Sequence, residues 1–237
     1  MSNQIQISAK NLGELAMPHF CPRCFWLKLR LRNKLPFQIF PGIFSSIDSY
    51  TKNIINGYFD KYNRFPSWLG ILGSLIGYKK SPHFSKFSII DDDNNILLTG
   101  VPDSIYVKTD QSHVVVDYKT ARYTGQQDKL MPMYEVQLNG YAMIGESCNF
   151  HPVSDLALIY MEPVTDSDAV NNESNHREDG FAMGFAANIH KVTLDLSIIP
   201  PLLAKTREIN ELSSAPDQSI GCKDCELLED LLVVTSE

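Results

Sequence analysis

Two Cys-x-x-Cys pairs near opposite ends of the sequence constrain the fold more than any other feature. Cys21 and Cys24 form the first pair, Cys222 and Cys225 form the second, and Cys148 stands alone between them. One such pair places two thiolates on a metal centre, and two pairs complete four ligands. The fold must then bring residues 1–40 against residues 213–237. The alternative is that the four thiols are unrelated and simply buried.

Length and composition indicate a globular protein in a reducing compartment. The chain has 237 residues, of which 43% are hydrophobic, which suits one domain with a sizeable core. A secreted disulfide scaffold is shorter and richer in cysteine. The N-terminus is not a secretory signal, and no apolar run reaches the roughly 18 residues of a membrane span. We therefore expect a cytoplasmic protein without a membrane partner.

The spacing of apolar residues predicts a mixed α/β fold. Residues 42–62 form a helix with Ile43, Ile47, Ile54 and Tyr58 on one face. Strands are expected where apolar residues alternate or run together, and a second and third helix where the helical period returns. The expected strands are 86–90, 96–99, 103–108, 113–117 and 156–161, with helices at 130–146 and 200–212. Residues 165–180 are polar and predict a surface loop. The order of elements favours a mixed central sheet with helices on its faces.

A group of acidic and basic residues falls where two of these strands meet. Asp103 begins one strand, and Asp117 and Lys119 end the next one. Residues two apart on a strand point to the same side, so Asp117 and Lys119 share a face. A short turn makes the strands antiparallel neighbours, which brings Asp103 across from Asp117. Carboxylates bind Mg²⁺ or Mn²⁺, and a nearby lysine orients an attacking water or stabilises charge.

The helix that follows carries Gln137 and Tyr141, which are four residues apart and therefore lie on one face. Both side chains can hydrogen-bond to a phosphate, to water or to Lys119. The alternative interpretation is that the acidic residues belong to turns and strand ends, with Lys119 as a solvated neighbour. The combination in this order, on strands and then a helix, favours a metal-dependent phosphodiesterase site.

The sequence resembles the RecB-like branch of the PD-(D/E)XK nuclease superfamily. Within that branch it is most similar to the CRISPR-associated RecB-like exonucleases that trim spacer precursors. The resemblance covers nearly the whole chain. The segments that carry it are Cys21-Pro22-Arg23 with Phe25 and Leu27, Gly100-Val101-Pro102-Asp103, Asp117-Tyr118-Lys119-Thr120, Gln137 with Tyr141, and the late cysteines.

The resemblance implies a restriction-endonuclease-like fold in a single domain, 1–237. Its catalytic core would be residues 84–196, and residues 1–40 and 213–237 would form a metal-cluster subdomain. Asp103, Asp117 and the Tyr118 carbonyl would bind Mg²⁺ or Mn²⁺. Lys119 would be catalytic, supported by Gln137 and Tyr141. Cys21, Cys24, Cys222 and Cys225 would hold a [4Fe–4S] cluster, and Zn²⁺ is the alternative because thiolates suit both.

Two features depart from the family pattern. The family places a histidine or glutamate ligand on the helix before the sheet, but residues 42–48 contain no histidine. Asp48, or a water held by Ser46, is the expected substitute. The iron–sulfur members have one early and three late cysteines, whereas this chain has two and two.

The residues of the site predict a metal-dependent nuclease. The resemblance further implies a deoxyribonuclease, an exonuclease on single-stranded DNA ends, in CRISPR adaptation or DNA repair with their protein partners. The alternative is a nuclease-fold module that binds DNA or docks a partner with a weakened site. An RNA-directed nuclease on the same fold is a third possibility. A net charge of −7 confines DNA contacts to a local basic track. The expected track is Lys28, Arg30, Arg32 and Lys34, unless these residues form a solvated face.

Overall fold

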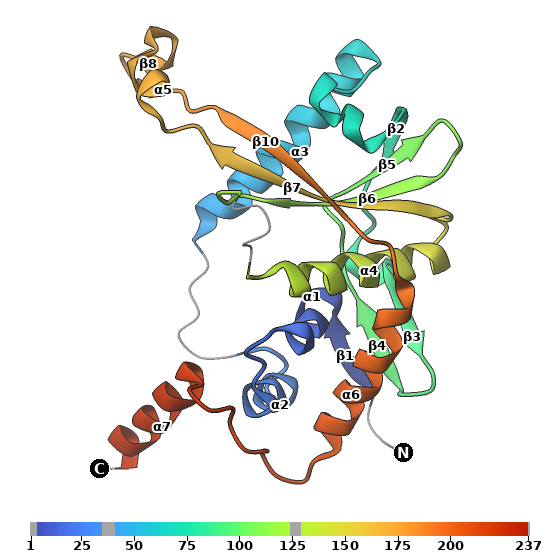
Figure 1. Cartoon of the computed structure of the whole chain (residues 1–237), viewed down its shortest axis with the longest axis vertical. Coiled ribbons are helices and arrows are strands. Elements are labelled where there is room, and N and C mark those ends of the chain that lie inside the picture. The colour runs from blue at the N-terminus through green and yellow to red at the C-terminus, as the bar shows by residue number, and fades with distance from the viewer. Residues whose placement is uncertain (1–3, 35–40, 124–128, 237) are drawn as a thin grey trace.

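A five-stranded mixed sheet forms the centre of the molecule (Figure 1). The structure is a computed structural model and describes residues 4–34, 41–123 and 129–236. The strand order is β10-β7-β6-β5-β2, with β6 and β7 parallel and the other neighbours antiparallel. The bounds are β2 (Leu75–Lys79), β5 (Ser104–Lys108), β6 (His113–Lys119), β7 (Val153–Pro163) and β10 (Phe185–Val192). The predicted α/β fold with a mixed central sheet is confirmed.

The run of valines in β6 is buried because both faces of the sheet are covered. Val114, Val116 and Tyr118 pack into one apolar cluster, and Val115 packs into a second cluster on the opposite face. This split follows from the alternation of side chains along a strand. A strand buried on both sides needs continuous apolar residues rather than alternation with polar ones.

Different helices cover the two faces. The 21-residue helix α3 (Gly42–Tyr62) and the 3₁₀ helix η2 (Ser67–Leu72) pack on the side of Val116 through Ile55, Leu69 and Leu72. The helix α4 (Met131–Ser147) covers the other side, where Leu138, Ala142 and Ile144 are buried. The predicted bounds of α3 are confirmed. Its predicted packing face is wrong, because Ile43 and Ile54 are exposed while Thr51 and Ile55 are buried.

A smaller sheet lies beneath α4 and contains the hairpin expected between residues 86 and 99. The strands β3 (Ser88–Asp91) and β4 (Ile96–Thr99) are antiparallel, and β1 (Ile5–Ser8) pairs with β4 in parallel. Thus the N-terminal segment supplies an edge strand to this sheet. The helix α1 (Ala9–Leu12) follows, with Ser8 as its N-cap, and continues into the 3₁₀ helix η1 (Gly13–Ala16).

Helices from the N-terminal and C-terminal segments meet at the opposite end of the molecule from the arm that β7 and β10 form (Figure 1). The helix α2 (Pro22–Arg30) lies beside α6 (Ile199–Glu211) and α7 (Lys223–Ser236). The Trp26 indole donates to the Leu212 carbonyl at 3.3 Å, and Arg30 donates to the carbonyls of Asn210 and Leu212. These bonds satisfy carbonyls that the end of α6 leaves free.

The polar segment at 165–180 lies on the surface as predicted, but it is not only a loop. It contains α5 (Ser167–Asn171), the 3₁₀ helix η5 (Glu173–Asn175) and β8 (His176–Arg177), which pairs with β9 (Gly180–Phe181). These short elements form the tip of the β7–β10 arm (Figure 1).

In the described part of the chain, no helix combines the length and apolarity needed to cross a membrane. Residues 1–3 and 35–40 of the proposed cluster subdomain lie outside the described residues, as does residue 237, and the subdomain boundaries remain a prediction.

Replacing either of two helical glycines with alanine should change stability in opposite directions, because their surroundings differ. A Cβ on Gly140 in α4 would lie 2.7 Å from the Cβ of Ala9, whereas a Cβ on Gly57 in α3 would meet nothing within 4 Å. Gly140→Ala should therefore lower the free energy of unfolding by about 1–3 kcal/mol through overpacking. Gly57→Ala should raise it by about 0.5–1 kcal/mol through helix propensity. Denaturant unfolding measures both, and equal effects would contradict the close packing of α1 on α4.

Candidate functional site

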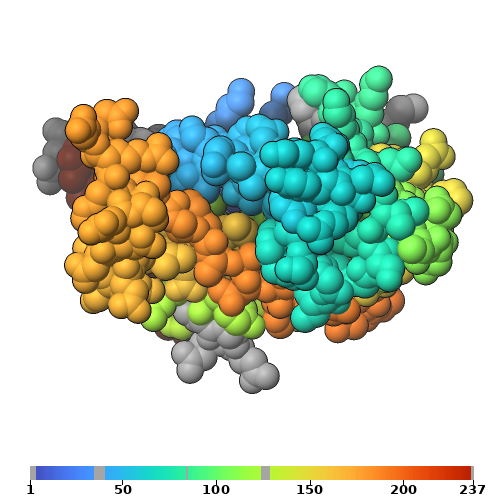
Figure 2. Space-filling model, turned by 90° about the horizontal axis from the view of Figure 1, so that it is seen from above, coloured from blue at the N-terminus to red at the C-terminus, as the bar shows by residue number. Residues whose placement is uncertain are grey.

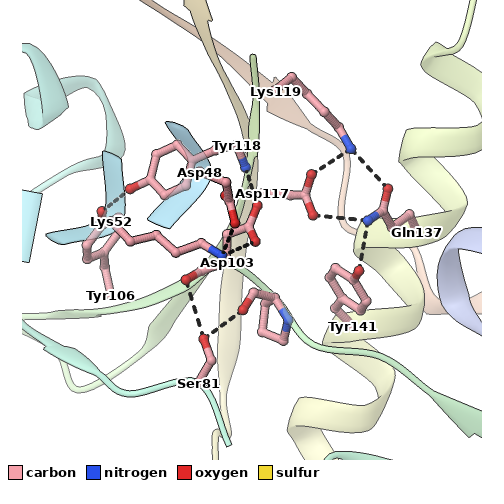
Figure 3. Close-up of polar contacts among 11 residues, drawn as sticks. Asp48, Lys52, Ser81, Asp103, Tyr106, Asp117, Tyr118, Lys119, Gln137 and Tyr141 are labelled. Atoms are coloured by element: carbon pink, nitrogen blue, oxygen red, sulfur yellow. Dashed lines mark hydrogen bonds and ion pairs between the residues drawn. The ribbon is translucent and has the colours of Figure 1, made fainter. Parts of the chain in front are cut away.

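The pairing of β5 with β6 places Asp103 against the end of β6 (Figure 3). Ser104 pairs with Val116, and continuing this antiparallel register puts Asp103 opposite Asp117. The Asp103 N–H donates to the Val116 carbonyl at 3.1 Å. The Tyr118 N–H donates to Asp103 Oδ2 at 2.7 Å. The backbone of β6 therefore holds the Asp103 carboxylate in position.

Asp117 and Lys119 lie on the same face of β6, toward α4 (Figure 3). Lys119 Nζ is 2.6 Å from Asp117 Oδ2 and donates to Gln137 Oε1 at 3.2 Å. Gln137 Nε2 in turn donates to Asp117 Oδ1 at 3.0 Å and to the Tyr141 hydroxyl at 2.8 Å. The structure thus brings together all four residues that the strand and helix patterns single out on this face.

The Gly100–Asp103 element and the helix residue Tyr141 fit against each other. A Cβ on Gly100 would collide with the Tyr141 ring, so only glycine permits this approach. Ser81 Oγ donates to the Pro102 carbonyl at 2.6 Å and fixes the next residues of the element. The glycine at position 100 therefore has a steric cause.

Tyr134 also belongs to this site, although the sequence reasoning missed it. Lys119 Nζ lies 4.0 Å from the centre of the Tyr134 ring, which is a cation–π distance. Tyr134 precedes Gln137 by three residues on α4, so it lies on the same helix face. That spacing was the available signal.

The helix α3 contributes Asp48 and a second residue missed from the sequence, Lys52 (Figure 3). Lys52 Nζ lies 2.8 Å from Asp48 Oδ2 and 2.7 Å from Asp103 Oδ1. The i, i+4 spacing of Asp48 and Lys52 was the available signal for this pair. The predicted substitute Asp48 is therefore linked to Asp103 through an ammonium group. Ser46 Oγ donates to the Gly42 carbonyl of its own helix.

Burial and crowding of acidic groups shift the ionisation of the site. Burial raises the pKa of Asp103 to about 6, Asp117 and Asp48 add to this, and Lys52 opposes it. Burial lowers the pKa of Lys52, but attraction to Asp103 and Asp48 outweighs burial, so its pKa is raised. Burial and the Asp117 charge raise the pKa of Tyr141, which keeps its hydroxyl protonated. Three carboxylates of the site, those of Asp48, Asp103 and Asp117, are thus paired with only two ammonium groups, those of Lys52 and Lys119.

The donor atoms suit a hard divalent cation. In a strand, the N–H and C=O of one residue point the same way. The Tyr118 N–H points to Asp103, so the Tyr118 carbonyl is expected on the same side of β6. This point lies beyond the first residue of β5, Ser104. Carboxylate and carbonyl oxygens are the ligands that Mg²⁺ and Mn²⁺ prefer. The carboxylates are held by Lys52, Lys119 and Gln137 rather than closed around one point.

Among the described residues, only the four paired cysteines form a set of acidic, histidine or thiol ligands whose atoms all lie within 4.8 Å. The Sγ–Sγ distances are 3.7 Å for Cys21–Cys225, 3.5 Å for Cys24–Cys222 and 3.3 Å for Cys24–Cys225. The four thiols, and Cys148, are free rather than disulfide-bonded. The four paired cysteines lie at the starts of α2 and α7, so the predicted link between the N-terminal and C-terminal segments is confirmed.

Two kinds of centre would space four thiolates differently. Zn–S bonds of about 2.3 Å at tetrahedral angles put thiolates about 3.8 Å apart. A four-iron cluster places four irons and four sulfides between the thiolates, which must then stand farther apart. Three of the six Sγ–Sγ distances are close to the spacing around a single tetrahedral ion, and all six lie within 4.8 Å.

The basic row after the first cysteine pair has partners within the chain. Lys28 Nζ lies 2.7 Å from Glu14 Oε2, and Arg30 binds the end of α6. Lys28, Arg30 and Arg32 line a polar groove of 660 Å³ between α2 and β1. Phe25 is buried and packs in the core. For Lys28 and Arg30 the structural role is thus observed, and a role in binding DNA remains a prediction.

A second groove lies along α3. It measures 410 Å³ and is apolar. Figure 2 shows this face, with α3 in light blue and the β7–β10 arm in orange on either side of a hollow. The lining residues are Tyr50, Thr51, Ile54, Ile55, Trp68, Met161, Met183, Phe185 and Ala187.

Comparison with known proteins identifies the family. The profile described as "PD-(D/E)XK nuclease superfamily" matches residues 59–229, which include Asp103, Asp117, Lys119 and Gln137. The chain belongs to this superfamily. A search of curated proteins finds no match. Among solved structures, the chain is similar to the crystal structure of SSO0001, with 14% identity, a TM-score of 0.44, and coverage of 91% of this chain and 81% of that one.

The raised pKa of Asp103 predicts how stability depends on pH without added divalent ions. The folded pKa of about 6 lies above the ordinary aspartate pKa of 3.8, so the folded state holds this proton more tightly. The stability contributed by Asp103 should fall as pH rises from about 4 to 6. Asp103→Asn has no proton to lose here, so its stability should not fall in this way. The free energy of unfolding of the variant minus that of wild type should therefore increase by about 2 kcal/mol across this pH window. A difference that stays flat in denaturant titrations would contradict the assignment.

Proposed function

We propose that this chain is a deoxyribonuclease that hydrolyses phosphodiester bonds with Mg²⁺ or Mn²⁺. One observation carries the proposal: Asp117, Lys119 and Gln137 form a closed hydrogen-bonded group beside Asp103, at the adjoining ends of two strands. Membership of the PD-(D/E)XK superfamily supports a nuclease. Burying this much charge is costly, and such groups are concentrated at functional sites.

The proposed ligands of the divalent ion are Asp103, Asp117 and the Tyr118 carbonyl, with Asp48 approaching from α3. A bound divalent ion supplies a water of lowered pKa and neutralises charge on the phosphate. Lys119, fixed by Asp117, Gln137 and the Tyr134 ring, is positioned to orient the attacking water and to stabilise negative charge. Tyr141 and Gln137 keep Asp117 in place. This division of roles follows the contacts of each side chain.

The finer features of the activity are also proposals. We infer DNA as the substrate and single-stranded ends as the preferred form, in CRISPR adaptation or repair, from the resemblance of the sequence to RecB-like exonucleases. The alternative is a DNA-binding or docking module with a weakened site. Its support is that Lys52 already neutralises Asp48 and Asp103, and that residues 42–48 lack a histidine.

We further propose that Cys21, Cys24, Cys222 and Cys225 hold one Zn²⁺. Three of the six sulfur–sulfur distances are 3.3–3.7 Å and all lie within 4.8 Å, which supports a single tetrahedral ion over the [4Fe–4S] cluster that the family resemblance implies. A centre of this kind has a structural role, because it ties α2 to α7. It lies apart from the carboxylates and takes no part in the hydrolysis.

The nuclease proposal predicts loss of cleavage on changing either member of the strand pair. Asp117→Asn and Lys119→Met should each slow the cutting of labelled single-stranded DNA in Mn²⁺ by about 100-fold or more. Lys108→Met is the matched control, because Lys108 forms a similar ion pair with Asp155 near the opposite end of the sheet. The control should cut within a few-fold of wild type. Equal activity in all four proteins, or none in wild type, would refute the proposal.

The zinc proposal predicts the metal content of protein purified without oxygen. Elemental analysis should give one zinc and no iron per chain, and the protein should be colourless. Cys24→Ser should lose the metal and unfold at lower temperature, because metal binding stabilises the fold. Cys148→Ser, which changes the one cysteine outside the tetrad, should keep the zinc. Four irons per chain and a brown colour would instead establish the cluster.

A further inference from the structure

Lys52 occupies the place between two carboxylates that a metal ion would take. Its Nζ lies 2.8 Å from Asp48 Oδ2 and 2.7 Å from Asp103 Oδ1. The two carboxylates come from different elements, α3 and the start of β5, and both turn toward the same nitrogen (Figure 3). The ammonium group thus already acts as the cation of this part of the site.

The surroundings explain why a cation is held there. The Asp103 side chain is only 17% exposed, and the Asp117 carboxylate adds negative charge close by. Asp117 has its own partners, Lys119 and Gln137, so Lys52 is the cation that Asp48 and Asp103 share. Without Lys52, these two carboxylates would face each other across a partly buried space, which is unfavourable.

We propose that Lys52 is a tethered competitor of the divalent ion, and that the ion must displace its ammonium group to reach Asp48 and Asp103. The inference rests on the proposed metal site and adds a control on how readily that site fills. The apparent affinity of the carboxylates for the ion is their intrinsic affinity multiplied by the fraction of molecules in which Lys52 has moved away. The chain is thereby stable without the ion and binds it weakly.

Binding of Mn²⁺ alone, measured by calorimetry on the purified full chain without DNA, tests this directly. Lys52→Met keeps the length of the side chain and removes its charge, and should lower the Kd for Mn²⁺ at least tenfold. The control is Lys61→Met, which removes one charge from the same helix at a residue that contacts the Tyr62 ring instead of a carboxylate. Its Kd should match wild type, which separates local competition from a general change in charge.

Thermal unfolding supplies a second readout that does not depend on activity. Before Mn²⁺ is added, Lys52→Met should unfold at a lower temperature than wild type, because Asp48 and Asp103 then lack their cation. Added Mn²⁺ should raise its Tm by more than it raises that of wild type. Lys52→Gln, which can still donate hydrogen bonds to both carboxylates, serves if the methionine variant does not fold, and should also bind Mn²⁺ more tightly.

The outcomes separate this inference from the proposed function. An Mn²⁺ affinity in the folded Lys52 variant equal to or weaker than that of wild type would overturn the competitor role and leave the nuclease proposal standing. Absence of Mn²⁺ binding in both wild type and the Lys52 variants would overturn the metal site itself, and with it both proposals.

Discussion

The antiparallel pairing of β5 with β6 is the constraint on which the site depends. Because Ser104 pairs with Val116, the start of β5 lies beside the end of β6, and the Tyr118 N–H donates to the Asp103 carboxylate. A shift of one residue in this register would turn Asp117 and Lys119 to the other face of the sheet. The buried valines of β6 prevent such a shift, since each face requires its own set. The apolar core of the sheet thus fixes the polar geometry at its end.

The helices on the two faces of the sheet supply the other residues of the site. Helix α4 supplies Gln137, Tyr141 and Tyr134, which surround Asp117 and Lys119. Helix α3, on the opposite face, supplies Asp48 and Lys52, and the Lys52 ammonium group bridges Asp48 and Asp103. The cysteine tetrad holds the two chain ends together away from these groups. The fold therefore separates a centre suited to stabilising the structure from one suited to chemistry.

The sequence predicted best what depends on local pattern. The strand that ends in Asp117 and Lys119, the bounds of α3 and the meeting of the cysteine pairs all follow from spacing. Strands β1 and β2 were missed, because their short or glycine-containing segments become strands only through pairing with β4 and β5. The packing face of α3 was mistaken because burial there depends on the sheet, which covers Thr51 and leaves Ile54 exposed. Lys52 and Tyr134 were missed because their importance comes from contacts between distant segments.

The central claim is that carboxylates from adjoining strands converge on one divalent ion. Anomalous diffraction from crystals soaked in Mn²⁺ tests it most directly. The account predicts a manganese peak bounded by Asp103, Asp117 and the Tyr118 carbonyl, with Lys52 turned away from Asp103. A structure at saturating Mn²⁺ with no peak there, and with Lys52 still bridging Asp48 and Asp103, would contradict it.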